Sequence, residues 1–337
     1  MPKRHLVVPA LLASAALILS GCSAQTTAGA DGPTTGLRVV ATTTQVADFT
    51  RNIVGDASGV DLTQLIQPNQ SAHSYDPSAA DLTALGAADV LVINGVGLEE
   101  WLDDAIAASG FDGVLIDADA GITISEVGAG EHHTEAADAA GDAHAHDGGD
   151  PHIWTDVRNA ETIVRTITDG LAAADAGKAA NFETNATAYT AQLRALDTWI
   201  RTNVDTVPES DRLLVSNHDA LGYFTAAYHI DYVGSVIPSF DDNAEPSAAE
   251  IDALVAAVRA TGVTAVFSEA SLSPKTAKTI ATEAGVTVYS GDDALYVDSL
   301  GPEGSAGDTY IKAQLHNATV MLDSWGVTPS SLPAELE

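Results

Sequence analysis

A long apolar stripe in the middle of the chain, over residues 178–205, limits the folds that this sequence can adopt. Its apolar residues recur at spacings of three, four or seven positions, as on one face of a helix with 3.6 residues per turn. They are Phe182, Tyr189, Leu193, Leu196, Ile200 and Val204. No proline interrupts the stripe before Pro208. The stripe therefore predicts one stiff helix of about six turns.

Short β-rich runs alternate with helical patterns on both sides of this helix. The expected strands cover residues 37–41, 90–93, 113–116, 213–215, 263–267 and 286–289. The expected helices cover residues 46–54, 163–171, 251–258 and 309–325. Such alternation is typical of β-α units with parallel strands. We therefore expect an α/β fold with two Rossmann-like lobes, residues 37–177 and 206–337, which the rigid helix joins and a cleft separates.

The N-terminus has the organisation of an export signal. Lys3 and Arg4 give a short basic start, and the 15 residues Leu6–Ser20 are almost all apolar. This length suits a signal peptide, whereas a membrane-spanning helix needs roughly 20 apolar residues. The run ends at Gly21-Cys22, which resembles the lipobox of bacterial lipoproteins. The alternative is an uncleaved membrane anchor with a free cysteine.

On the lipobox interpretation, residues 1–21 are a signal peptide and Cys22 carries the lipid. Residues 22–36 are small and polar, which is typical of a flexible tether. We therefore expect an extracytoplasmic protein that is lipid-anchored to the cell membrane without crossing it. Cys22 is the only cysteine, so no internal disulfide is available and the core must be stabilised by packing.

The charge balance limits the possible partners. The chain has 14 Lys and Arg residues against 47 Asp and Glu residues, a formal net charge of −33. A nucleic-acid partner is excluded because its recognition requires a basic surface. The negative charge favours solubility and attracts cations in general, but it does not define a site.

Three histidines stand in similar polar, turn-forming surroundings. They are His73 in Ser-Ala-His-Ser-Tyr-Asp-Pro, His152 in Asp-Pro-His-Ile-Trp and His218 in Ser-Asn-His-Asp. Ligand sites of α/β lobes collect in loops at the carboxyl ends of strands, and imidazole suits Zn²⁺. Each histidine taken singly has the alternative of a hydrogen-bonded loop residue, because the wide spacing matches no local metal motif.

These segments resemble those of the metal-binding lipoproteins of bacterial ABC importers for zinc and manganese, the group with a rigid helix between its lobes. His73, His152 and His218 match the first three ligand motifs, and Asp298 in Tyr-Val-Asp-Ser-Leu matches the fourth. The segment Asn94–Leu102 and the nearby Gly307–Tyr310 also fit. The resemblance covers essentially the whole mature chain.

The resemblance implies a solute-binding protein with a metal cleft formed by His73, His152, His218 and Asp298. Manganese-preferring relatives place a carboxylate at the third position and zinc-preferring relatives a histidine, so His218 indicates Zn²⁺, with Mn²⁺ as the alternative. The implied partners are an ABC permease and its cytoplasmic ATPase, and we expect a monomer. A surface adhesin and a zinc hydrolase are further alternatives, the latter disfavoured because four protein ligands leave no open position.

A segment before Asp150, residues 127–149, is rich in Gly, Ala, Asp and His and has no apolar period. It contains His132, His133, His144 and His146. These histidines are either an auxiliary low-affinity zinc site or part of a solvated insertion.

Several other polar and aromatic residues receive a structural interpretation. Glu269 follows a predicted strand and could orient a histidine, but we favour a structural hydrogen bond. The acidic loop residues Asp241, Asp242, Asp292 and Asp293 are expected to be solvated. His229, His316, Tyr75, Trp101 and Trp154 are interpreted as fold residues.

Overall fold

The structure is a computed structural model that describes residues 36–125 and 149–337. The expected signal peptide, Cys22 and almost all of the tether lie outside the described residues. The same holds for the auxiliary histidines His132, His133, His144 and His146.

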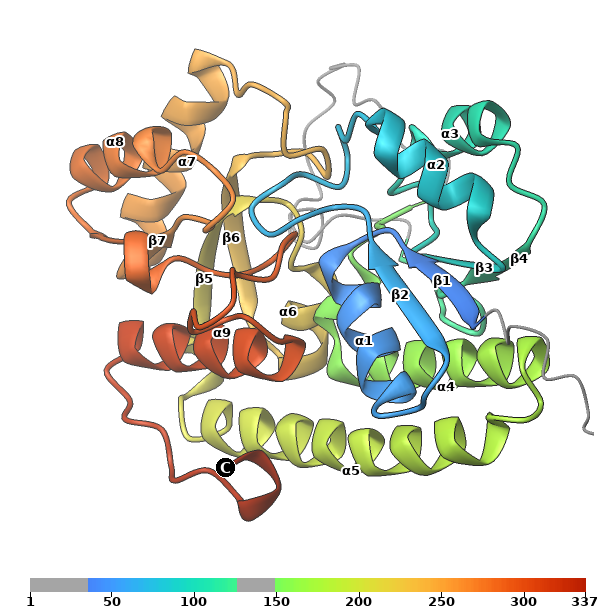
Figure 1. Cartoon of the computed structure of the whole chain (residues 1–337). Coiled ribbons are helices and arrows are strands. Elements are labelled where there is room, and N and C mark those ends of the chain that lie inside the picture. The colour runs from blue at the N-terminus through green and yellow to red at the C-terminus, as the bar shows by residue number, and fades with distance from the viewer. Residues whose placement is uncertain (1–35, 126–148) are drawn as a thin grey trace, which may run out of the picture. The chain divides into compact units, whose positions relative to one another are not determined.

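The first part of the chain, here the described residues up to the end of helix α4 (Val157–Ala174), contains a sheet of four parallel strands (Figure 1). Their order is β2-β1-β3-β4. They are β1 (Leu37–Ala41), β2 (Val60–Gln64), β3 (Val90–Ile93) and β4 (Val114–Asp117). All four residues of β3 are apolar and buried. A continuous apolar run of this kind is typical of a parallel strand that is covered on both faces.

Helices cover both faces of this sheet. They are α1 (Thr44–Val54), α2 (Ala79–Ala87), α3 (Leu102–Ser109) and α4 (Val157–Ala174). Val39 and Val92 pack in one hydrophobic cluster with residues of α1 and α4. Their neighbours Val40 and Leu91 pack in another cluster with residues of α2 and α3. The alternation of side chains along each strand therefore places two separate hydrophobic layers around the sheet.

The long helix α5 spans Ala179–Val204, within the range of the apolar stripe. The stripe residues Leu193, Leu196 and Ile200 are fully buried. α5 contacts α1 and α4 of the first part of the chain and the later helices α6 and α9 (Figure 1). The stripe therefore faces a core shared by both parts, and this core continues along the helix.

The second part of the chain, which follows α5, contains two parallel sheets of two strands each, β5-β6 and β7-β8. Their strands are β5 (Leu213–His218), β6 (Asp231–Ile237), β7 (Ala265–Phe267) and β8 (Thr287–Tyr289). The helices are α6 (Gly222–Tyr228), α7 (Ala248–Thr261), α8 (Lys275–Ala284) and α9 (Tyr310–Ser324). Parallel strands alternating with helices in both parts confirm the α/β fold class.

The structure differs from the expectation in several elements. β2, β6, α2, α3, α6 and α8 were not expected. β5 extends three residues beyond the predicted Val215, so His218 is its last residue. α2 begins with a capping box in which Ser78 and Asp81 each accept a hydrogen bond from the other's backbone N–H. These elements form because tertiary packing supports sequences whose own periodicity is weak.

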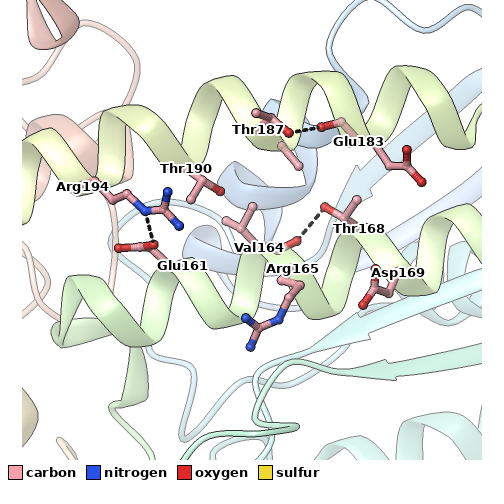
Figure 2. A pocket seen from close by; sticks show the side chains of 10 residues that line it. Glu161, Val164, Arg165, Thr168, Asp169, Glu183, Thr187, Thr190 and Arg194 are labelled. Atoms are coloured by element: carbon pink, nitrogen blue, oxygen red, sulfur yellow. Dashed lines mark hydrogen bonds and ion pairs between the residues drawn. The ribbon is translucent and has the colours of Figure 1, made fainter.

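Within the described ranges, no helix is both long enough and apolar enough to cross a membrane. An open groove of about 380 Å³ lies between α4 and α5 (Figure 2). It contains the Arg194–Glu161 ion pair, with a distance of 2.8 Å between Nε and Oε2. None of the four expected metal ligands lines this groove.

Candidate metal centre

The structure brings the four expected ligands together from four separate segments. His73 lies in the turn between β2 and α2, and His152 immediately precedes a short 3₁₀ helix, Ile153–Thr155. His218 ends β5, and Asp298 lies in the segment before α9. One ligand atom from each residue lies within 4.8 Å of the others. The wide spacing in the sequence therefore becomes a compact three-histidine, one-aspartate cluster.

The Asp298 carboxylate lies at the centre of this cluster. Its Oδ2 is 3.1 Å from His218 Nε2 and 3.4 Å from His73 Nε2, and its Oδ1 is 3.4 Å from His152 Nε2. The Nε2 atoms of His152 and His218 are 3.4 Å apart. Three imidazole nitrogens and one carboxylate thus converge, which is the number and kind of ligands that a four-coordinate zinc ion takes.

The cluster is almost completely shielded from solvent. His152 and His218 are fully buried, and the side chains of Asp298 and His73 are 1% and 5% exposed. Among the described residues, Nε2 of His73 and both carboxylate oxygens of Asp298 are buried without a hydrogen-bond partner. Such atoms are costly to bury unless they are satisfied, and coordination of a cation would satisfy all three.

Asp150 fixes the orientation of His152. Its Oδ1 is 2.7 Å from His152 Nδ1 and also accepts the backbone N–H of His152 at 3.0 Å. A carboxylate at Nδ1 holds a proton on that nitrogen, which leaves the lone pair of Nε2 directed at the cluster. Asp150 directly precedes Pro151-His152 in the sequence, but its spacing alone does not indicate this role.

Glu269 holds the orientation of His218 in the way that Asp150 holds that of His152. Its Oε1 is 2.5 Å from His218 Nδ1 and accepts the backbone N–H of His218 at 3.2 Å. Glu269 is 2% exposed, and burial raises its pKa even though the His218 charge opposes this shift. The preferred interpretation from the sequence was a structural hydrogen bond. This hydrogen bond is present, and its position at Nδ1 is the one that the alternative, a carboxylate that orients a histidine, requires.

The charges of the cluster are strongly interdependent. Burial lowers the pKa of His218, but the negative charges of Asp298 and Glu269 outweigh burial and hold that pKa well above its usual value. Burial also lowers the pKa of His73, but the hydrogen bond and the charge of Asp298 outweigh burial and raise that pKa above its usual value. Burial alone would raise the pKa of Asp298, yet His218 and His152 hold it well below the usual range. The carboxylate is therefore ionised and available to a cation.

Neighbouring side chains hold the ligand segments in place. Trp101 Nε1 donates to the carbonyl of Ala72 beside His73, at 2.9 Å. Asn94 Nδ2 donates to the carbonyl of Pro151 beside His152, at 3.0 Å. Trp154 and Tyr75 pack against His152 and Trp101 at ring-centroid distances of 5.4 and 5.0 Å. Packing, as expected for these aromatic residues, thus supports the site indirectly.

The acidic loop residues behave differently from one another. Asp292 and Asp293 are exposed, as expected, and Asp241 is half-buried. Asp242, in contrast, is only 5% exposed, so its prediction as a solvated residue is wrong. Its burial is offset in part by a hydrogen bond that its carboxylate accepts from Ser71, which lies 171 positions away in the sequence. No local pattern reveals such a contact.

The remaining histidines of the described ranges lie outside the cluster. His229 is exposed at the end of α6, with a left-handed backbone. His316 lies in α9 and its Nε2 is 2.9 Å from the carbonyl oxygen of Ala294. Both have the ordinary structural roles that the sequence indicated.

Comparison with known proteins agrees with this geometry. Residues 39–324 match the model of the family described as "ZnuA: Zinc-uptake complex component A periplasmic". The manganese-binding lipoprotein MntA of Halalkalibacterium halodurans is 33% identical over 302 residues, which cover 90% of this chain and 92% of the relative. An iron ABC transporter substrate-binding lipoprotein, MtsA of Streptococcus pyogenes, is 27% identical over 91% of this chain and 94% of its own length.

A solved structure also has the same fold. The periplasmic zinc-binding protein TroA from Treponema pallidum superposes with a TM-score of 0.74 at 26% identity, covering 85% of this chain and 98% of TroA. The match of the family model to most of the sequence, together with these relatives, shows that the chain belongs to the ZnuA family of metal ABC transporter substrate-binding proteins.

Proposed function

We propose that the protein captures Zn²⁺ outside the cytoplasm at His73, His152, His218 and Asp298 and delivers it to the permease of an ABC importer. The observation that carries this proposal is the convergence of three buried imidazole nitrogens and one carboxylate within 4.8 Å. A zinc hydrolase is rejected, because the family consists of substrate-binding proteins of transporters rather than enzymes.

Donor chemistry supports zinc over manganese. Three nitrogen ligands and one oxygen ligand suit Zn²⁺, whereas Mn²⁺ prefers oxygen-rich shells. The relatives themselves divide by name between manganese, iron and zinc. The choice for this chain therefore depends on its own ligands, and above all on His218.

Capture would proceed by ligand replacement. The hydrated ion exchanges its water molecules for the three Nε2 atoms and the Asp298 carboxylate, which lie in a site that is nearly closed to solvent. Asp150 and Glu269 hold two of the imidazoles in the orientation that presents a lone pair. Since protonated imidazole cannot bind a metal, capture displaces protons.

The rest of the chain serves to place this site at the membrane. In this proposal residues 1–21 are removed, lipidated Cys22 anchors the mature monomer, and residues 22–36 are the tether. Residues 37–177 and 206–337 form the two lobes, joined by the helix over residues 178–205. Two of the relatives bear lipoprotein names, which supports the anchor.

The permease with its cytoplasmic ATPase receives the ion, as the transporter names of the relatives suggest. The segment 127–149, with His132, His133, His144 and His146, serves as an auxiliary zinc collector. Comparing the metal content of the mature protein with and without this segment tests that role.

Replacement of a central ligand tests the main proposal. His152→Ala should weaken Zn²⁺ binding by more than about 100-fold in calorimetry, because a fully buried ligand and its oriented lone pair are lost. His229→Asn is a matched control, since His229 is exposed and asparagine tolerates its left-handed backbone. Unchanged Zn²⁺ affinity of His152→Ala would refute the assignment. A parallel titration with Mn²⁺ tests the choice of metal.

A further inference from the structure

The loop after β6, residues 238–245, reaches from the second part of the chain to two of the ligand segments. The Phe240 ring lies 6.0 Å from the His152 ring, measured between centroids. Two residues later, Asp242 Oδ1 accepts a hydrogen bond of 2.8 Å from the hydroxyl of Ser71. Asp242 is buried although the adjacent Asn243 is exposed. The loop therefore packs against the ring of one ligand and bonds to the turn that carries another.

Ser71 connects this loop to a ligand. Its hydroxyl oxygen accepts the backbone N–H of His73 at 3.2 Å while the hydroxyl donates to Asp242. His73 is the ligand at the more open edge of the cluster, with a side chain 5% exposed against 0% for His152 and His218. Within the described residues, no second carboxylate lies behind its ring as Asp150 and Glu269 do for the others. Ser71 thus holds the position of His73 together with the hydrogen bond from Trp101 to Ala72.

Asp242 also faces the charges of the metal centre. Its Oδ1 accepts a second hydrogen bond, from Asn243 at 2.7 Å, but its Oδ2 is buried without a partner among the described residues. Burial raises the pKa of Asp242, as does the charge of Asp298, while Ser71, His73 and His218 oppose the shift. A cation in the cluster would therefore stabilise the ionised Asp242 carboxylate.

The Asp298 segment is held by the first part of the chain although it belongs to the second in sequence. The carbonyl of Val297 accepts hydrogen bonds from Gln45 at 2.8 Å and Trp154 at 3.0 Å. The N–H of Leu300 donates to Thr44, and the N–H of Asn69 donates to Ser299. The same segment also pairs with the second part, because the backbone of Leu295 bonds to Ser268 and Ala270. Asp298 is thus held by both parts of the chain, whereas His73 and His152 belong to the first. His218 and the loop 238–245 approach the cluster from the second part.

We propose that the hydrogen bond between Ser71 and Asp242 is a clasp that holds the loop 238–245 closed over the bound ion and fixes the turn that carries His73. Asp242 is then a positioning residue that slows release of the ion. The inference rests on the proposed function, because it requires that the four-residue cluster binds a metal.

Closure of the clasp and binding of the ion must each favour the other. A bound dication attracts the Asp242 carboxylate, so the closed loop is favoured when the site is occupied. By linkage, closing the clasp raises the affinity for the ion by the same factor. This coupling gives a measurable consequence for the rate at which the ion leaves.

The test is the rate of Zn²⁺ release from the full mature protein, measured by stopped flow with an excess of chelator. Ser71→Ala should accelerate release about tenfold, and Ser71→Thr, which keeps the hydroxyl, should restore the original rate. Asp242→Ala should have a similar effect, and the double variant should release Zn²⁺ no faster than either single variant. Asp292→Asn is the control, since it removes one exposed charge from the second part of the chain.

A merely structural role of the hydrogen bond would lower the stability of the metal-free protein and leave the rate of Zn²⁺ release unchanged. The free energy of unfolding of each metal-free variant is therefore measured alongside, so that faster release of Zn²⁺ can be separated from the loss of stability that a broken buried hydrogen bond causes. The clasp would be refuted by a Ser71→Ala variant that releases Zn²⁺ at the original rate. It would also be refuted if the effects of the two single variants on the release rate were additive in the double variant. This outcome is distinct from failure of the proposed function, in which His152→Ala itself retains Zn²⁺.

Discussion

Glu269 lies directly behind His218, with its Oε1 2.5 Å from the Nδ1 of the imidazole, and both side chains are buried. The two residues come from neighbouring strand ends of the second part of the chain, and β5 lies beside β7. This pair fixes which nitrogen of His218 faces the metal centre. It also adds a negative charge immediately outside the four ligands, which favours a bound cation.

Removal of this charge should weaken metal binding without removing a ligand. Glu269→Gln keeps a similar shape but no longer provides a carboxylate to His218 Nδ1. We expect Zn²⁺ affinity to fall about 10- to 100-fold in competition with a chromophoric chelator. Asp293→Asn, which removes an exposed charge, should have little effect. Equal affinities of the two variants would show that Glu269 does not act on the metal.

Changing the third ligand should alter the choice of metal. His218→Asp replaces a nitrogen ligand by oxygen, and oxygen-rich shells favour Mn²⁺. The new carboxylate would face Glu269, however, and two buried like charges repel each other. The double variant His218→Asp/Glu269→Gln should therefore show the larger shift, with the ratio of Zn²⁺ to Mn²⁺ affinity reduced at least about tenfold. A ratio that stays constant in competition titrations would contradict the role of His218.

The fold class could be predicted from the periodicity of the sequence. The four residues of the cluster could be predicted only through the resemblance to a known family, because their spacing matches no local metal motif. The apolar run of β3 and the stripe of α5 are visible without any partner, and the ligands stand in motifs of that family. β6, with a glycine inside Asp231–Ile237 and a mixed burial pattern, has no such signature. The contact between Ser71 and Asp242 joins distant segments, so only the folded chain reveals it. An acidic loop residue is normally solvated, which is why Asp242 was misjudged.

The shared core along α5 should dominate stability. Leu193 is fully buried in the cluster that joins both parts of the chain. Leu193→Ala should lower the free energy of unfolding by about 2–5 kcal/mol, because apolar contacts are lost and a cavity remains. Gln192→Ala on the exposed side of the same helix should change it by less than about 0.5 kcal/mol. Denaturant unfolding of the metal-free protein measures both, and similar losses would show that the helix contributes no specific packing.

Zn²⁺ affinity should decrease as the pH is lowered. The raised pKa values of His73 and His218 mean that protons compete with the metal for both imidazoles. Neutral imidazole is the binding form, so lower pH increases the protonated fraction, and the decrease should begin above the usual histidine pKa of about 6.5. Asp298 should not contribute to it, because its pKa lies well below the usual range and it stays ionised. Calorimetry in two buffers with different ionisation enthalpies should detect protons released on binding. An affinity that does not change between about pH 8.5 and 5.5 would show that the histidines are not ligands.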